Sequence, residues 1–171
     1  GTGALAPHLI RVHSKVRPSI REIAIWGRRP EQATRLVAEL AASLPSLLGR
    51  PVEVRAVAER RDAIEAADIV SCATLSQTPL VEGKWLREGQ HIDLVGAYTP
   101  QMRESDDDAV VRARLFVDTR AGALKEGGDI AQPLARNIIC EKDVIADLQE
   151  LARGERPGRG NDAAAITLFK S

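Results

Sequence analysis

The sequence is poor in features that mark several classes of protein. Aromatic residues make up only 3% of its 171 residues, so it offers few platforms for stacking single-stranded bases. Its 24 basic residues balance 24 acidic ones, and the zero net charge provides no overall attraction to nucleic acid or to an anionic membrane surface. We therefore expect neither nucleic acid nor membrane as a partner.

Cysteines and long apolar runs are also scarce. Cys72 and Cys140 have neither metal-site spacing nor disulfide-framework partners, which favours a reducing cytoplasm and predicts no metal. No run approaches the ~20 apolar residues that cross a bilayer, and no secretion signal is recognisable. The acidic run 106–108 is better explained as a complement to the dipole at a helix start than as a metal site.

The first six residues, Gly1 to Ala6, follow the pattern G-x-G-x-x-A of a dinucleotide-binding turn. In such a turn the glycines allow a sharp bend and close approach of a pyrophosphate, and the third small residue lets a helix pack closely on a sheet. The diphosphate is then bound by N–H groups at the helix N-terminus. Short glycine patterns also arise by chance, and the expected preceding strand is absent. Either the chain is a fragment, or the match is accidental.

Strand-like and helix-like segments alternate along the chain. Strands are predicted over 22–26, 52–57, 68–74, 91–95, 115–118 and 166–169, and helices over 5–15, 30–48, 60–67, 106–112, 121–126 and 141–153. This alternation indicates an α/β fold of the Rossmann type, with a doubly wound, mostly parallel sheet whose first strand is missing. Ligands of such sheets bind beyond the carboxyl ends of the strands, which points to residues 1–5, 27–29, 73–76 and 95–98.

The segment Trp26-Gly27-Arg28-Arg29 carries the clearest signal for a cofactor. A fold that prefers NAD usually places an acidic residue here to bind the ribose 2′-hydroxyl. Two arginines instead favour a 2′-phosphate, because a guanidinium binds phosphate with paired, charge-assisted hydrogen bonds. NADP(H) is the preferred cofactor and NAD(H) the alternative. The competing interpretation is that Arg28 and Arg29 are ordinary solvated charges.

Taken together, these segments resemble the ornithine cyclodeaminase and μ-crystallin family. The resemblance covers essentially the whole chain and favours the fragment over the accidental match. The matching segments are Gly1 to Ala4, Ile25 to Arg28, Ala67 to Val70, Ala73-Thr74, Pro79 to Val81, Trp85-Leu86, Gly89, His91 to Asp93, Gly96-Ala97, Pro100, Met102 to Glu104, Asp107, Val117-Asp118, Gly128-Asp129 and Phe169 to Ser171.

The resemblance implies a two-domain protein, of which residues 1–171 would be the NAD(P)-binding domain. A second, largely N-terminal domain would supply most substrate contacts and form a homodimer. The cofactor-binding residues expected from the turns and the resemblance together are Gly1, Thr2, Gly3, Ala4, Leu5, Gly27, Arg28, Arg29, Ala73, Thr74, Ser76, Val95, Gly96, Ala97 and Ser171.

The family interconverts amino acids and imino or keto acids by hydride transfer. In the cyclodeaminases the segment resembling Gly96 to Pro100 carries an aspartate, and here Tyr98 takes that place. A phenol keeps its proton near neutral pH and is a poor general base. We therefore expect NADP(H)-dependent reduction of a cyclic imino acid such as pyrroline-2-carboxylate, with Tyr98 as the catalytic candidate or a spectator at the pocket rim. Three alternatives remain, namely an ornithine cyclodeaminase forming proline and ammonia, a non-catalytic NADPH-dependent binding protein, and a shikimate-dehydrogenase-like enzyme.

Overall fold

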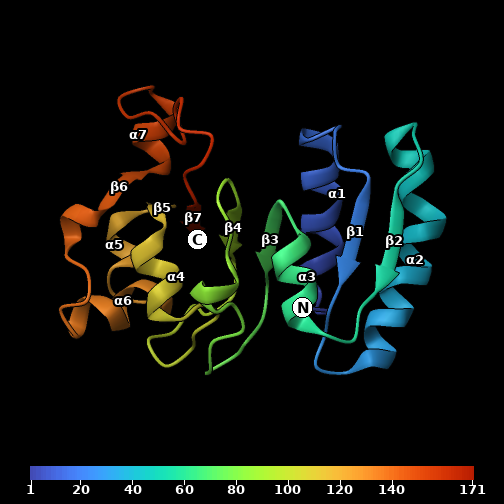
Figure 1. Ribbon diagram of the computed structural model, residues 1–171, viewed down its shortest axis with the longest axis horizontal. Coiled ribbons are helices and arrows are strands. Elements are labelled where there is room, and N and C mark those ends of the chain that lie inside the picture. The colour runs from blue at the N-terminus through green and yellow to red at the C-terminus, as the bar shows by residue number, and fades with distance from the viewer. The chain divides into compact units, whose positions relative to one another are not determined.

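The computed structural model describes all 171 residues and forms two compact units, unit 1 (Gly1–Ala63) and unit 2 (Ile64–Ser171). Strands and helices alternate along the chain, and every strand pair is parallel (Figure 1). The predicted α/β class with parallel sheets is therefore confirmed. The assignment of the whole chain to one nucleotide-binding domain stays a prediction.

Unit 1 is a small parallel sheet covered by helices. Its elements are α1 (Ala6–Val16), β1 (Glu22–Ile25), α2 (Pro30–Leu48) and β2 (Glu53–Ala56). Pro30 begins α2, where its missing N–H costs nothing, and Gly49 ends it in a left-handed conformation with φ +64°. Leu40 and Leu44 of α2 are completely buried, so the apolar stripe of this helix forms the centre of the unit's core.

Unit 2 is built on a five-stranded sheet with the order β3-β4-β7-β5-β6 (Figure 1). Its strands are β3 (Ile69–Cys72), β4 (His91–Leu94), β5 (Arg114–Val117), β6 (Val144–Asp147) and β7 (Thr167–Lys170). The last strand of the chain, β7, therefore lies in the middle, paired with β4 on one side and β5 on the other. Consequently the final residues of the sequence reach the carboxyl edge of the sheet beside the end of β4.

Short helices connect the strands of unit 2. The helix α3 (Arg60–Ala66) crosses the boundary between the units, and the others are α4 (Asp107–Arg112), α5 (Arg120–Ala123), α6 (Gly128–Ala135) and α7 (Leu148–Ala152), with 3-10 turns η1 (Gly83–Trp85) and η2 (Glu141–Asp143). Asp106 caps α4, accepting a hydrogen bond from the N–H of Ala109, as the acidic run predicted. None of the helices combines the length and the apolar character needed to cross a bilayer.

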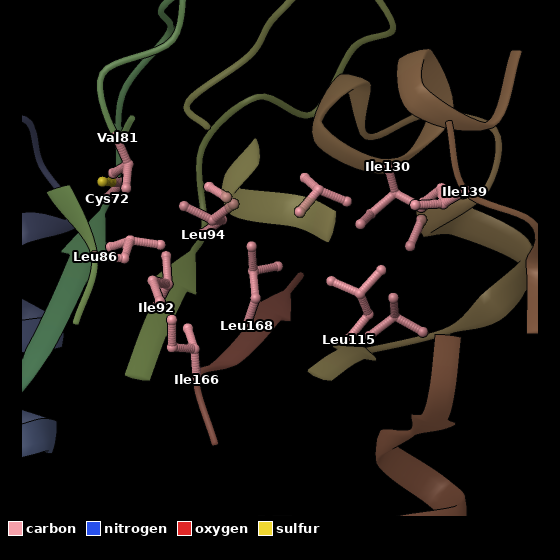
Figure 2. Packing of buried hydrophobic residues seen from close by; sticks show 14 of the residues in the cluster. Cys72, Val81, Leu86, Ile92, Leu94, Leu115, Ile130, Ile139, Ile166 and Leu168 are labelled. Atoms are coloured by element: carbon pink, nitrogen blue, oxygen red, sulfur yellow. The ribbon is translucent and has the colours of Figure 1, made fainter. Parts of the chain in front are cut away.

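The core of unit 2 lies under the central strands. Figure 2 shows Ile92, Leu94 and Leu168 from β4 and β7 beside one another, and all three are fully buried. Burying a side chain of this size contributes about 1.5–3 kcal/mol. Cys72 belongs to the same cluster, and burial raises the pKa of its thiol, so it is a small core residue as predicted. The loops that follow these strands are therefore attached to a well-packed core.

The prediction of one helix over residues 141–153 was wrong. The segment divides into η2, β6 and α7, and β6 contains the β-branched pair Val144-Ile145. Asp147 then caps α7 in a capping box with Glu150, and this start signal is visible in the sequence. The helix α6 was missed because Gly127 precedes it, Gly128 is its first residue, and Pro133 lies inside it.

Candidate functional site

In unit 1 the glycine-rich turn lies against the loop that follows β1. The amino nitrogen of Gly1 donates a hydrogen bond to the carbonyl oxygen of Trp26, at 3.0 Å. A Cβ atom at Gly27 would lie 2.7 Å from the methyl carbon of Thr2, so a side chain at position 27 would push that residue away. The structure therefore brings together the two segments in which the sequence predicts diphosphate and adenosine contacts.

The turn itself leaves backbone donors without partners. Gly3, Ala4 and Leu5 are exposed, and none of their N–H groups donates a hydrogen bond. A Cβ atom at Gly3 would have no neighbour within 4 Å, so the space beside it is open. The hydroxyl of Thr2 donates to Gln32 of α2 at 3.2 Å and fixes the turn to that helix. Together, these groups form an anchored bend with N–H groups available to an anion.

The tryptophan and the arginines of the following loop are placed differently. The indole N–H of Trp26 donates to the carbonyl oxygen of Ala58 at 3.2 Å, and the guanidinium of Arg60 lies 5.6 Å from the ring centroid. Trp26 is thus held within unit 1. In contrast, Arg28 and Arg29 are exposed immediately before α2, and neither guanidinium is paired with a protein group.

In unit 2 the loops after β3 and β4 touch at the carboxyl edge of the sheet. The carbonyl oxygen of Thr74 accepts a hydrogen bond from the N–H of Ala97 at 3.2 Å. A Cβ atom at Gly96 would collide with the same oxygen, so only glycine fits there. Ala97 is fully buried with φ +54°, a left-handed conformation that a non-glycine residue adopts at a cost. The loops are therefore closely fitted to each other.

Glu104 joins these two loops. Its Oε1 accepts hydrogen bonds from the N–H and the hydroxyl of Thr74, at 2.6 and 2.7 Å, and its Oε2 accepts one from the N–H of Gly96 at 2.9 Å. The side chain is fully buried. Burial raises the pKa of Glu104, against the lowering effect of the hydrogen bonds from Thr74 and Gly96.

Asp129 and Lys170 extend this network below the loops. Oδ1 of Asp129 accepts hydrogen bonds from the N–H groups of Glu104 and Ser105, at 2.9 and 2.7 Å, and from the Ser105 hydroxyl at 2.8 Å. Nζ of Lys170 donates to the carbonyl oxygens of Gly96, at 2.8 Å, Leu94, at 3.3 Å, and Ser171. Burial raises the pKa of Asp129 and lowers that of Lys170, while the opposite charges of this pair partly offset both shifts.

The remaining predicted residues of unit 2 differ in exposure. Tyr98, with 62% of its surface exposed, and Ser171 are accessible at the carboxyl edge, and Ala73 and Val95 are half-buried. The hydroxyl of Ser76 donates to the carbonyl oxygen of Thr78 at 2.7 Å and closes a turn. The structure thus gathers the predicted residues into two groups, one in each unit.

Sequence reasoning named none of Glu104, Asp129 and Lys170 as a site residue. All three lie in segments that carry the family resemblance, Met102 to Glu104, Gly128-Asp129 and Phe169 to Ser171. They share no local signal, because Glu104 lies in the loop between β4 and α4, Asp129 lies in α6, and Lys170 is the last residue of β7. Their convergence depends on long-range contacts, across 24 to 76 positions of sequence, which no local pattern reveals.

Comparison with known proteins identifies the group to which these features belong. The profile of the ornithine cyclodeaminase/mu-crystallin family matches residues 1–171. The chain belongs to this family. The predicted family is therefore confirmed over the full length of the sequence.

Three relatives illustrate the similarity within the ornithine cyclodeaminase/mu-crystallin family. The Δ1-pyrroline-2-carboxylate reductase of Paracoccus denitrificans is 38% identical over 172 residues, covering 100% of this chain and 52% of that protein. The structure of the Thermococcus litoralis Δ1-pyrroline-2-carboxylate reductase with NADH and L-proline has a TM-score of 0.89 at 35% identity, covering 100% of this chain and 50% of the other. The structure of the iminosuccinate reductase of Paracoccus denitrificans with NAD⁺ has a TM-score of 0.81 at 29% identity, covering 99% of this chain and 48% of the other. The chain spans about half the length of the curated relatives it matches.

Proposed function

We propose that this chain is the nucleotide-binding part of an NAD(P)-dependent oxidoreductase that reduces a cyclic imino acid of the pyrroline-2-carboxylate type. The observation that carries the proposal is the contact in unit 1 between the glycine-rich turn and the Trp26 loop. This contact joins a phosphate-binding bend to a loop with free guanidinium groups, as a dinucleotide requires. The two pyrroline-2-carboxylate reductases among its relatives support the substrate class.

A nicotinamide dinucleotide fits the residues present in unit 1. The open space beside Gly3 allows phosphate oxygens to approach the N–H groups of Gly3, Ala4 and Leu5. Arg28 and Arg29 have no protein partner and are free to bind the adenosine ribose or its 2′-phosphate. For this reason we prefer NADP(H) to NAD(H), although the structures of the Thermococcus litoralis and Paracoccus denitrificans reductases hold NADH and NAD⁺.

In unit 2 the carboxyl-edge loops would receive the nicotinamide end of the cofactor and the imine. When bound, the reduced nicotinamide supplies the hydride that adds to the imine carbon, while the protonated nitrogen becomes the amine. Tyr98 is exposed at this edge, where its phenol orients the substrate or relays a proton. Binding of the substrate carboxylate and homodimer formation would belong to a second domain, which is consistent with the half-length coverage of the relatives.

The experiment mixes the complete protein with pyrroline-2-carboxylate and either NADPH or NADH. The reaction is monitored by the loss of absorbance of the reduced nicotinamide. Turnover is expected with both cofactors and is faster with NADPH. Arg28→Ala should weaken NADPH binding far more than NADH binding, whereas Arg35→Ala, an exposed arginine within α2, should change neither. Equal losses for both cofactors would overturn the NADP preference. Ammonia release from ornithine without net NAD reduction would identify a cyclodeaminase, and cofactor binding without turnover a non-catalytic binding protein.

A further inference from the structure

We infer that Glu104 is a positioning residue that fixes the loops after β3 and β4 for the nicotinamide end of the cofactor, an inference that rests on the proposed function. Its carboxylate is the single side chain bonded to both loops, at Thr74 and Gly96. These loops lie at the carboxyl edge of the sheet, where ligands of parallel sheets bind. The buried carboxylate thus acts on the site through the backbone that it holds.

The hydrogen bonds specify a carboxylate at this position. Three donors converge on Glu104, namely the N–H and hydroxyl of Thr74 and the N–H of Gly96. A carboxylate offers acceptors on both of its terminal atoms. A glutamine would place an N–H₂ group against one of the two loops, opposite an N–H donor. Glu104→Gln therefore preserves one anchor and breaks the other, whichever way the amide turns.

The Gly96 peptide is restrained on three sides. Glu104 holds its N–H, Lys170 holds its carbonyl oxygen, and the carbonyl oxygen of Thr74 occupies the space where a side chain would begin. Tyr98 follows two residues later, after the strained backbone of Ala97. The direction in which the chain presents Tyr98 at the edge is therefore set by the buried ions. Loss of one anchor would let this segment turn.

Asp129 supports Glu104 from the next layer. It accepts hydrogen bonds from the backbone N–H groups of Glu104 and Ser105, so it fixes the segment from which the Glu104 side chain extends. Oδ2 of Asp129 is buried without a partner. Buried, incompletely paired ions are an inefficient source of stability, because apolar side chains of similar volume often stabilise a core equally well or better. The arrangement is better explained by the loop geometry that it imposes.

Gln90 provides a matched control at the opposite edge of the same sheet. Like Glu104 it is fully buried and makes three hydrogen bonds, accepting from the N–H of Arg87 and donating to the carbonyl oxygens of Ile64 and Ala67. It precedes β4, whereas Glu104 holds the loop that follows it. Gln90→Met removes three hydrogen bonds without touching the carboxyl edge. It therefore reports what lost stability alone does to the cofactor site.

The experiment compares the complete protein with its Glu104→Gln, Glu104→Met and Gln90→Met variants in three measurements. These are the binding of ADP, which carries only the adenosine end, the fluorescence of bound NAD(P)H, and kcat and KM with pyrroline-2-carboxylate. Glu104→Gln is expected to lower kcat roughly ten- to hundredfold, because a small misplacement of reacting groups costs about that much. Glu104→Met should lower kcat further, and both should shift the nicotinamide fluorescence. ADP affinity should stay within about twofold in every variant, since ADP does not reach the nicotinamide site.

The outcomes separate this inference from the proposed function. Unchanged kcat and fluorescence in Glu104→Gln, with a wild-type protein that binds NAD(P)H and turns over, would overturn the positioning role alone. The same fluorescence shift in Gln90→Met would also overturn it, because general destabilisation would then explain the effect. Failure of the wild-type protein to bind ADP or NAD(P)H would instead overturn the proposed function.

Discussion

The two edges of the five-stranded sheet in unit 2 are held by different chemistry. At the amino edge, Gln90 bonds backbone groups through a neutral amide, and Arg159 donates to the carbonyl oxygens of Gly89, Gln90 and Ala165 from a half-buried position. At the carboxyl edge, Glu104, Asp129 and Lys170 are all buried ionisable residues. In Figure 1 the segments of these edges lie at the top and the bottom of the sheet, respectively.

The side chains at the two edges have different roles. Those at the amino edge stabilise the strand starts, whereas those at the carboxyl edge fix the geometry of the loops. Donors at the amino edge satisfy carbonyl groups at strand starts, a task that costs little when the side chain is neutral or in contact with water. Ions at the carboxyl edge incur a large desolvation cost, which their mutual attraction only partly offsets. A protein that needed only stability at that edge would do as well with apolar packing. The charged network therefore indicates that a fixed backbone shape is required there.

The largest effect is expected from removing the buried cation. Lys170→Met keeps the approximate length of the side chain but leaves the Gly96 carbonyl oxygen without its donor, removes one of the two hydrogen bonds to the Leu94 carbonyl oxygen, and takes away the positive charge near Asp129 and Glu104. Breaking a buried ion network in this way costs about 3–5 kcal/mol. The free energy of unfolding from urea titration measures this loss. A change below about 1 kcal/mol would mean that the network is not energetically coupled.

A smaller loss is expected at the amino edge. Arg159→Ala removes hydrogen bonds to Gly89, Gln90 and Ala165 and a bond to the hydroxyl of Thr167. Because the guanidinium is only half-buried, water replaces part of what is lost, and we expect a destabilisation of about 1–3 kcal/mol. Urea titration measures the change, and NAD(P)H fluorescence is the control. If Arg159→Ala shifted the fluorescence of bound NAD(P)H as much as Glu104→Gln, the two edges would not differ in their effect on the cofactor.

The alternation of strands and helices could be predicted from the sequence because it depends on local patterns. The apolar periodicity of residues 30–48 and the stop at Gly49 predicted α2, and the acidic residues 106–108 marked the start of α4. The prediction of one helix over residues 141–153 was wrong because the strand in this segment has only four residues and lies between helical signals. At that length, pairing with β5 decides the structure, and a sequence window does not contain the partner.

The candidate site could be predicted only where a backbone feature marks it. Gly27 and Gly96 permit close approach of chain segments, and Gly3 leaves open space beside its turn, so glycine patterns located candidate residues in each unit. The buried ions behind the loops had no comparable mark. A carboxylate that binds three protein donors and one that is solvated look identical in sequence, and long-range hydrogen bonds alone distinguish them.

The pH dependence of stability provides a third test at the carboxyl edge. Burial raises the folded-state pKa of Asp129, so its contribution is greatest below the ordinary carboxyl range and declines as pH rises through the raised value. Asp129→Asn retains an acceptor and does not titrate. Relative to this variant, the wild type should lose stability with rising pH, by at most about 1.4 kcal/mol per pH unit. Parallel stability curves for the two proteins would show that Asp129 has no raised pKa.

The smallest effect is expected from an exposed charge at the same edge, which tests whether burial, rather than charge, makes this edge sensitive. Asp107 accepts hydrogen bonds from buried Arg103 at 2.5 Å and from half-exposed Arg136 at 2.6 Å. Burial alone would raise the pKa of Asp107, but the two arginines lower it overall. Arg136→Ala should therefore cost only about 0.2–1 kcal/mol at neutral pH, because the partner is solvated and Arg103 remains.

The pH dependence of that loss follows from the sign of the shift. A lowered folded-state pKa stabilises the protein above the ordinary carboxyl range and ceases to do so as pH falls through the folded value. The difference between wild type and Arg136→Ala in urea titration should accordingly vanish in acid, opposite to the trend expected for Asp129. If Arg136→Ala instead lowered the free energy of unfolding as much as Lys170→Met, exposed and buried charges at this edge would be equally important. Burial would then not explain the contrast with the amino edge.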